Sequence, residues 1–135
     1  MIRFSLVDEN EEYFSKEKLV FNIFISNIAD YLKNGYNVIA DATHLNPTSR
    51  EKLFNAIWEK IDLSKVKVVG VVMRAPLNVC KIRNEQRKGT RSYVPTYALT
   101  NMFNAFKVPT YKEYNHIFDE IYIVENNKVY FKEKE

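Results

Sequence analysis

Residues 37–50 have the sequence NVIADATHLNPTSR, which contains an apolar run, a polar loop and a helix start in that order. The apolar run breaks at Asp41 and predicts a short strand buried on both faces, as in parallel sheets. Asn46 and Pro47 then predict a helix start, because Asn caps helix N-termini and Pro suits the first helical position. The stretch therefore predicts one strand–loop–helix unit of an α/β domain.

Further strands and helices are expected on both sides of this unit. Residues 65–73 (KVKVVGVVM) form the clearest predicted strand, and residues 121–124 and 129–131 predict a third strand and its hairpin partner. The expected helices cover residues 15–34, 47–61, 76–87 and 95–106, with a short helical turn at 110–113. Alternating strands and helices predict an α/β fold with a parallel sheet and right-handed crossovers.

Length and composition narrow the class of protein. With 135 residues, 46% of them hydrophobic, residues 1–135 are expected to form a single domain with a real core. Cys80 is the only cysteine, which excludes a disulfide scaffold and fits a reducing compartment. No apolar run approaches the roughly 20 residues that span a bilayer, and the N-terminal residues lack the pattern of a signal peptide. A cytoplasmic location is expected.

Asp41 is the first candidate for chemistry. Ligands of open α/β sheets bind beyond the carboxyl ends of the strands, where Asp41 is predicted to lie. Mg²⁺ prefers a carboxylate combined with phosphate oxygens, and the loop that follows offers Thr43, His44 and Asn46 to a substrate. The alternative is a plain turn, in which the Asp side chain bonds its own backbone.

The second candidate is residues 83–91, RNEQRKGTR, which hold three of the six arginines. Arg83 and Arg87 are spaced to share one helical face. Guanidinium groups suit phosphate oxygens and stabilise a phosphoryl group in transfer, while Gly89 gives the following loop freedom to close over a ligand. The alternative is a solvated basic face with Glu85 as a partner.

Three blocks of the sequence together resemble the P-loop kinases of the polynucleotide-kinase type. VIADATHLNPTSR (38–50) is similar to that family's second-acid strand and loop, and APLNVCKIRNEQRKGTRSYVP (75–95) to its lid. FKVPTYKEYNHIFDEIYIV (106–124) is similar to its closing block. The resemblance implies a three-layer P-loop NTPase-like fold, a parallel sheet with helices on both faces, and a lid around residues 83–95.

The resemblance also implies ATP-dependent phosphoryl transfer to a hydroxyl, either the 5′-OH of a nucleic acid or that of a small molecule. Asp41 would position Mg²⁺, and Arg83 and Arg87 would contact the ATP phosphates and act as catalytic arginines. Arg91 would be a third lid arginine. The acceptor site would hold Arg3, Thr43, Asn46 and Arg50.

The sequence departs from that family at its N-terminus. No G-x-x-x-x-G-K-[ST] phosphate loop is present, since the only glycines are Gly35, Gly70 and Gly89. The family's general-base Asp would fall just before Met1. We therefore expect the first two strands to be missing and little or no kinase activity from this chain, as in a truncated reading of a longer protein. The alternatives are a non-catalytic module that binds nucleotide or RNA phosphates, and a subunit or homo-oligomer completed by another chain.

Overall fold

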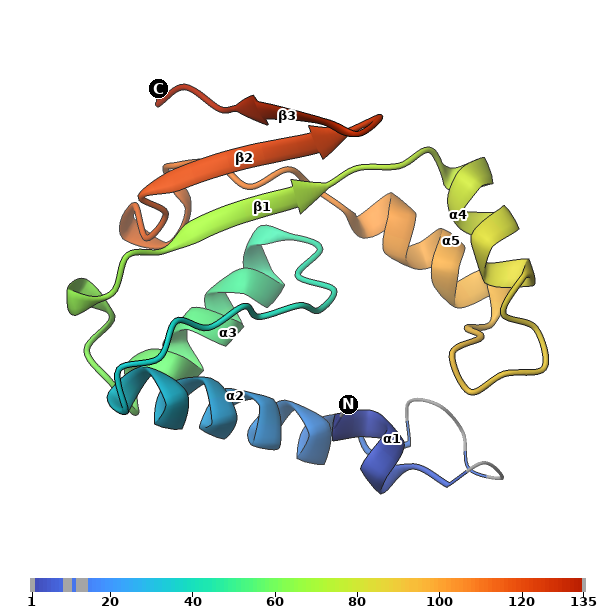
Figure 1. Cartoon of the computed structure of the whole chain (residues 1–135), viewed down its shortest axis with the longest axis horizontal. Coiled ribbons are helices and arrows are strands. Elements are labelled where there is room, and N and C mark those ends of the chain that lie inside the picture. The colour runs from blue at the N-terminus through green and yellow to red at the C-terminus, as the bar shows by residue number, and fades with distance from the viewer. Residues whose placement is uncertain (1, 9–10, 12–14, 135) are drawn as a thin grey trace.

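Figure 1 shows the computed structural model, which describes residues 2–8, 11 and 15–134. The helices are α1 (Ile2–Leu6), α2 (Glu17–Lys33), α3 (Pro47–Trp58), α4 (Leu77–Glu85) and α5 (Thr96–Ala105), with 3₁₀ turns η1 (Leu63–Lys65) and η2 (Glu113–Asn115). The strands are β1 (Val69–Met73), β2 (Glu120–Glu125) and β3 (Lys128–Phe131). Helices α2 to α5 are confirmed close to their predicted positions, whereas the sequence patterns did not predict α1.

The three strands form one mixed sheet in the order β1-β2-β3. β1 and β2 are parallel, with Gly70 opposite Ile121, and β2 and β3 form the expected antiparallel hairpin. Asn126 and Asn127 have positive φ angles of 51° and 60° at the hairpin turn, the conformation that a two-residue turn needs to match the strand twist. The α/β class, the parallel pair and the hairpin are therefore confirmed.

The predicted strand at residues 37–41 is wrong. This segment is extended but pairs with no strand in the described part of the chain. Val38 and Ala40 pack against the core, whereas the side chain of Ile39 between them is 95% exposed. The alternating burial shows a chain that lies against the core on one side only. A ladder of backbone hydrogen bonds, which defines a strand, is missing.

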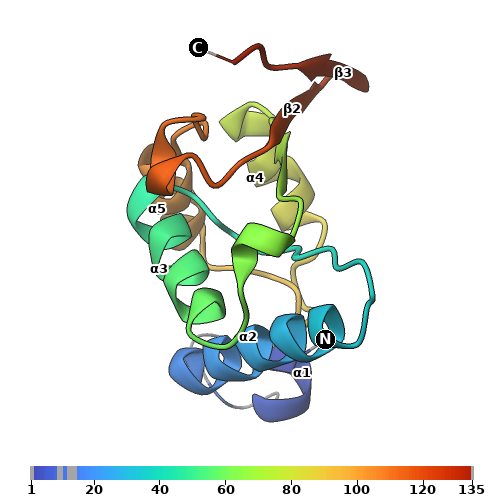
Figure 2. The same cartoon turned by 90° about the vertical axis from the view of Figure 1, so that its left-hand side faces the viewer.

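The sheet is covered on one face only within the described residues. Val72 and Ile121 are 5% and 0% exposed on the covered face, where a Cβ on Gly70 would lie 3.1 Å from the ring of Phe118. On the opposite face Val71 is 59% and Met73 is 73% exposed. The predicted helices on both faces are thus not seen: the described part has one helical layer against the sheet (Figure 2).

The core lies between this sheet and helices α2 and α3. It is formed by buried side chains from these elements, from η1 and from the segment before β2: Ile25, Ile28, Leu53, Phe54, Ile57, Leu63, Val72, Tyr111, Phe118 and Ile121. The rings of Phe54 and Phe118 meet edge-on at 5.5 Å, which joins α3 to the segment before β2. No helix in the described ranges has the length and hydropathy to cross a bilayer.

Candidate functional site

Apart from Arg3 on α1, the predicted site residues lie on two segments, one after the apolar stretch 37–40 and one after β1. Figure 1 shows α4 and α5 beyond the carboxyl ends of β1 and β2. The loop 41–46 is tied to the chain after α5, since the Lys107 amide donates to the Leu45 carbonyl at 2.7 Å. Segments far apart in sequence thus converge at the side of the sheet where α/β proteins bind ligands.

The loop 41–46 ends in a well-formed helix start. Asn46 Oδ1 accepts from the Ser49 amide at 2.9 Å, and Ser49 Oγ accepts from the Asn46 amide at 3.2 Å. This reciprocal capping box fixes the entry into α3. Asp41 and Thr43 are exposed ahead of it, and Asp41 forms no hydrogen bond or ion pair with any described residue. The Asp41 carboxylate is therefore available to a cation or a hydroxyl.

Arg50 is held in a buried ion pair. Its Nε and Nη2 donate to Glu113 Oε2 and Oε1, each at 2.8 Å, and its Nη1 donates to the His44 carbonyl at 2.8 Å. The Arg50 side chain is 4% exposed. Glu113 Oε1 also accepts from the Thr110 amide at 3.2 Å, so the predicted turn at 110–113 is present. The geometry gives Arg50 a structural role, because it joins α3, η2 and loop 41–46. Its contact with an acceptor stays a prediction.

His44 is a buried polar group inside this loop. Its Nε2 is buried and has no hydrogen-bond partner among the described residues, and its ring lies 6.1 Å from that of Phe24. Burial lowers the pKa of His44 below its ordinary value, and the nearby charge of Arg50 adds to that effect. A neutral imidazole is thus favoured at the base of the loop that carries Asp41.

Arg83 lies in the last turn of α4 and Arg87 in the turn that follows, because the helix predicted over 76–87 ends at Glu85. Both side chains are exposed, and neither forms a hydrogen bond or ion pair with any described residue. Between them Asn84 is 5% exposed and holds the lid (residues 83–95) closed on itself. Its Nδ2 donates to the Val94 carbonyl at 2.7 Å, and its Oδ1 accepts from the Val94 amide at 3.0 Å. The two arginines thus flank a residue whose hydrogen bonds hold the end of α4 against the far side of the lid.

Arg91 and Arg3 lie in other surroundings. Arg91 Nη2 donates to the Val7 carbonyl at 2.5 Å, which joins the lid to the end of α1. Arg3 on α1 forms an ion pair with Glu17 on α2 at 2.5 Å. Arg3 therefore faces α2, and its place at the acceptor site remains a prediction.

The lid and its flanks concentrate positive charge. Residues 74–107 contain one acidic residue, Glu85, although the chain as a whole has 17. The seven basic residues of this segment are Arg74, Lys81, Arg83, Arg87, Lys88, Arg91 and Lys107. The chain's net charge of +3 thus conceals a strongly basic arm. Such a local field attracts polyanions.

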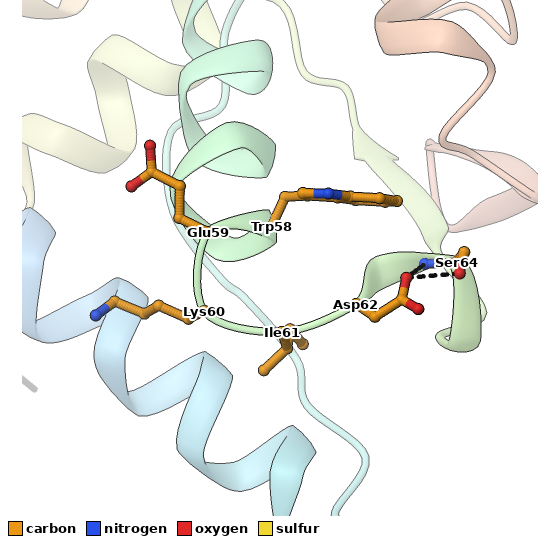
Figure 3. A pocket seen from close by; sticks show the side chains of 6 residues that line it. All are labelled: Trp58, Glu59, Lys60, Ile61, Asp62 and Ser64. Carbon is orange, nitrogen blue, oxygen red and sulfur yellow. Dashed lines mark hydrogen bonds between the residues drawn. The ribbon is translucent and has the colours of Figure 1, made fainter.

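Neither of the most evident hollows in the described surface includes a predicted site residue. Figure 3 shows the larger one, at the turn after α3, where Trp58, Glu59, Lys60, Ile61, Asp62 and Ser64 line an open depression. Asp62 accepts hydrogen bonds from the Ser64 amide and hydroxyl, which also lie in this lining. No group of three or more metal-ligating side chains occurs within the described ranges. The exposed loop and helix near the strand ends remain the better candidate, because they hold unpaired charges.

Two residues that the sequence patterns did not single out shape this site. Asn84 sits between the lid arginines, and its burial on an otherwise exposed helix gives no signal in the sequence. Glu113 was expected only as part of a helical turn. Its spacing to Thr110 gave the turn, but its pairing with Arg50, 63 residues away, has no sequence pattern.

Comparison with protein families gives one match. The model of a family described as an AAA domain matches residues 3–109, which include the loop 41–46, α4 and the lid. Neither the search of curated proteins nor that of solved structures finds a match. Because the match covers more than half of the chain, the chain belongs to this AAA-domain family, whose fold is P-loop NTPase-like and whose general activity is nucleotide binding of a kinase-like kind.

Proposed function

We propose that this chain carries the lid and acceptor side of an ATP-dependent phosphotransferase. The observation that carries the proposal is the pair of exposed arginines Arg83 and Arg87, unpaired among the described residues, at the end of α4 and in the turn after it, beyond the strand ends. Guanidinium groups suit phosphate oxygens, and two of them four residues apart can share the phosphates of one nucleotide. Because neither side chain has a partner among the described residues, each can bind a phosphate group without first breaking an ion pair.

Asp41 fits a magnesium-binding role only together with a nucleotide. One carboxylate is too few for a metal site of its own, but Mg²⁺ commonly takes one or two carboxylates and completes its shell with phosphate oxygens and water. Bound there, Mg²⁺ would neutralise charge on the phosphates of ATP. Asp41 would orient the ion, while Arg83 and Arg87 would hold the phosphates and stabilise the charge that develops during transfer.

The acceptor of the phosphoryl group is a hydroxyl, on a polynucleotide 5′ end or a small molecule. Thr43 is exposed beside Asp41 and can donate to or accept from such a group. Asn46 Oδ1 accepts the capping hydrogen bond from the Ser49 amide, so its side-chain nitrogen Nδ2 is the atom that could donate to a ligand. Because residues 1–135 contain no phosphate loop, we expect weak ATP binding and little or no turnover from them alone.

Calorimetric titration of the chain with Mg·ATP tests this proposal. Arg83→Gln and Arg87→Gln should each weaken binding roughly 10-fold, the effect of losing one charged hydrogen bond. Lys33→Gln, at an exposed position in the last turn of α2, also removes one positive charge. It should change the affinity for Mg·ATP by less than about twofold. Unchanged affinity in both arginine variants, or no binding at about 10 mM ATP, would contradict the proposal.

The same titration separates the proposal from a non-catalytic phosphate-binding module. A binding module needs Arg83 and Arg87 but has no use for the carboxylate of Asp41. Asp41→Asn should therefore weaken Mg·ATP binding in a phosphotransferase and leave the binding of a short RNA unchanged. If RNA binds tightly with a steep salt dependence while Asp41→Asn has no effect on Mg·ATP, the module is the better description.

A subunit completed by another chain is the second candidate, and a specific observation favours it. Within the described residues, the edge of β1 away from β2 pairs with no strand, and the extended segment 37–41 also lacks a partner. Unpaired strand edges recruit further strands. Co-expression with a polypeptide that carries a G-x-x-x-x-G-K-[ST] strand–loop–helix unit tests this idea. Co-purification and slower amide exchange in residues 69–73 are expected, and exchange rates equal to those of the chain alone would refute it.

A further inference from the structure

The lid is tied to the N-terminal helix by one arginine. Arg91 Nη2 donates to the carbonyl of Val7, 84 residues away, at 2.5 Å. Val7 is 6% exposed and directly follows α1. Its amide donates to the Arg3 carbonyl at 2.9 Å and so continues the hydrogen bonding of that helix. In Figure 1 the lid descends from α4 toward α1. A helix end with unpaired carbonyls is a favourable place for a cation.

Cations lie at the end of α1, and an ion pair joins the helix to α2. Lys16 Nζ donates to the Leu6 carbonyl at 2.6 Å, beside the carbonyl that Arg91 takes. Arg3 pairs with Glu17 on α2. With five residues, α1 is too short to be stable without such contacts. The hydrogen bond from Arg91 is a contact between the docked helix and the lid.

The lid does not need Val7 to keep its shape. Asn84 clamps Val94 from within, and the Thr90 amide and hydroxyl both donate to the Arg87 carbonyl, at 2.9 and 2.6 Å. Gly89 adopts a φ of +84° at the turn. Arg91 can thus leave the Val7 carbonyl while these bonds keep the rest of the lid folded. The side chains of Arg83 and Arg87, in contrast, have no partner among the described residues to exchange.

We propose that the Arg91–Val7 contact is a latch, for which a phosphate ligand and helix α1 compete. The proposal rests on the function proposed above, in which the lid binds nucleotide. A phosphate oxygen makes a shorter and roughly twofold stronger hydrogen bond to a guanidinium than a neutral carbonyl does. When phosphate binds, Arg91 leaves Val7, and α1 loses the lid's contribution to its docking. By linkage, the docked helix lowers the affinity for phosphate by the same factor.

Hydrogen exchange of the peptide spanning residues 2–8 reports the state of the latch in the full chain. Saturating Mg·ATP should raise its exchange rate about 5-fold, because opening of a short helix becomes easier. Arg91→Gln should give the fast rate without ATP and no further rise with it. Lys88→Gln removes a lid charge that does not touch Val7, and should keep the slow rate.

A second variant tests the reciprocal effect. Glu17→Gln removes the ion pair between α1 and α2, so α1 competes less well for Arg91. ATP affinity should rise about 2- to 5-fold, the scale of an exposed ion pair. Unchanged or weaker affinity would count against the latch.

The outcomes separate the two proposals. If ATP binds, as calorimetry shows, but exchange in residues 2–8 does not change, the latch is wrong and the proposed function stands. If Arg91→Gln keeps the slow exchange, the contact does not hold α1 and the latch is again wrong. If ATP does not bind the wild-type chain at all, the proposed function fails and the latch fails with it.

Discussion

Arg50 on α3 and Glu113 on η2 form a two-pronged ion pair whose side chains are only 4% and 10% exposed. It connects the helix after loop 41–46 with the segment that leads into β2. Arg50 also donates to the His44 carbonyl, so the loop that carries Asp41 is fastened to the same point. The position of the candidate magnesium ligand therefore depends on a buried charge pair.

Glu113→Gln should be strongly destabilising. Removing one partner of a buried ion pair leaves an uncompensated buried charge and costs roughly 3–5 kcal/mol in the free energy of unfolding. Lys67→Gln, which breaks the exposed pair with Glu120, should cost less than about 1 kcal/mol. Urea denaturation of both variants measures the difference. Equal midpoints would show that Arg50 finds another partner or water.

The stability of the fold should fall in mild acid because of His44. Its pKa is lowered in the folded chain by burial, so below its ordinary value of 6.5 the unfolded chain binds more protons than the folded chain. The contribution of neutral His44 to the free energy of unfolding is therefore fully present above pH 6.5. It decreases as the pH drops from 6.5 toward the lowered pKa of the folded chain. His44→Gln should lose less stability than the wild type between about pH 7.5 and pH 5. A parallel decrease in both chains would exclude His44 as the cause.

The helices were predictable because their signals are local. Prolines at the helix starts and apolar residues at helical spacing decide α3, α4 and α5, whatever the rest of the chain does. The strand at 37–41 was not predictable in the same way. Its apolar run is strand-like, but a strand also needs a neighbour, and no local pattern states whether one is present. Ile39, 95% exposed, shows the consequence.

The site was predictable as residue types and not as contacts. The spacing of Arg83 and Arg87 indicated a phosphate-binding face, and within the described residues the structure leaves both unpaired. The resemblance places Arg50 at the acceptor site and Arg91 in the lid, and it names no partner for either. Their partners, Glu113 and the Val7 carbonyl, lie 63 and 84 residues away, and only the folded chain brings them together.

Asn84→Ala should loosen the lid without unfolding the domain. The substitution removes both hydrogen bonds to Val94, each worth about 1 kcal/mol, and exposes a backbone stretch rich in Arg and Lys. Limited trypsin digestion should cut at Arg87, Lys88 or Arg91 about 10-fold faster. Asn104→Ala, on an exposed face of α5, should be digested like the wild type. Faster cleavage elsewhere in the chain would instead indicate global destabilisation.

The uncovered sheet face should make the chain associate with itself. Val71 and Met73 are 59% and 73% exposed on this face, and the adjoining hairpin adds Val129 at 65% and Phe131 at 46%. Exposed apolar patches of this kind occur where another surface packs.

The double variant Val71→Lys with Met73→Lys tests this idea by sedimentation velocity at about 100 μM, a concentration at which weak pairs form. The wild type should sediment faster than a monomer and the variant as a monomer. Leu19→Lys, on α2, adds charge at another exposed apolar side chain and should behave as the wild type does. If all three sediment as monomers, the face does not hold copies of the chain together. A helical layer from another polypeptide would then be the expected cover for this face. Such a layer would supply the second set of helices that the resemblance implies.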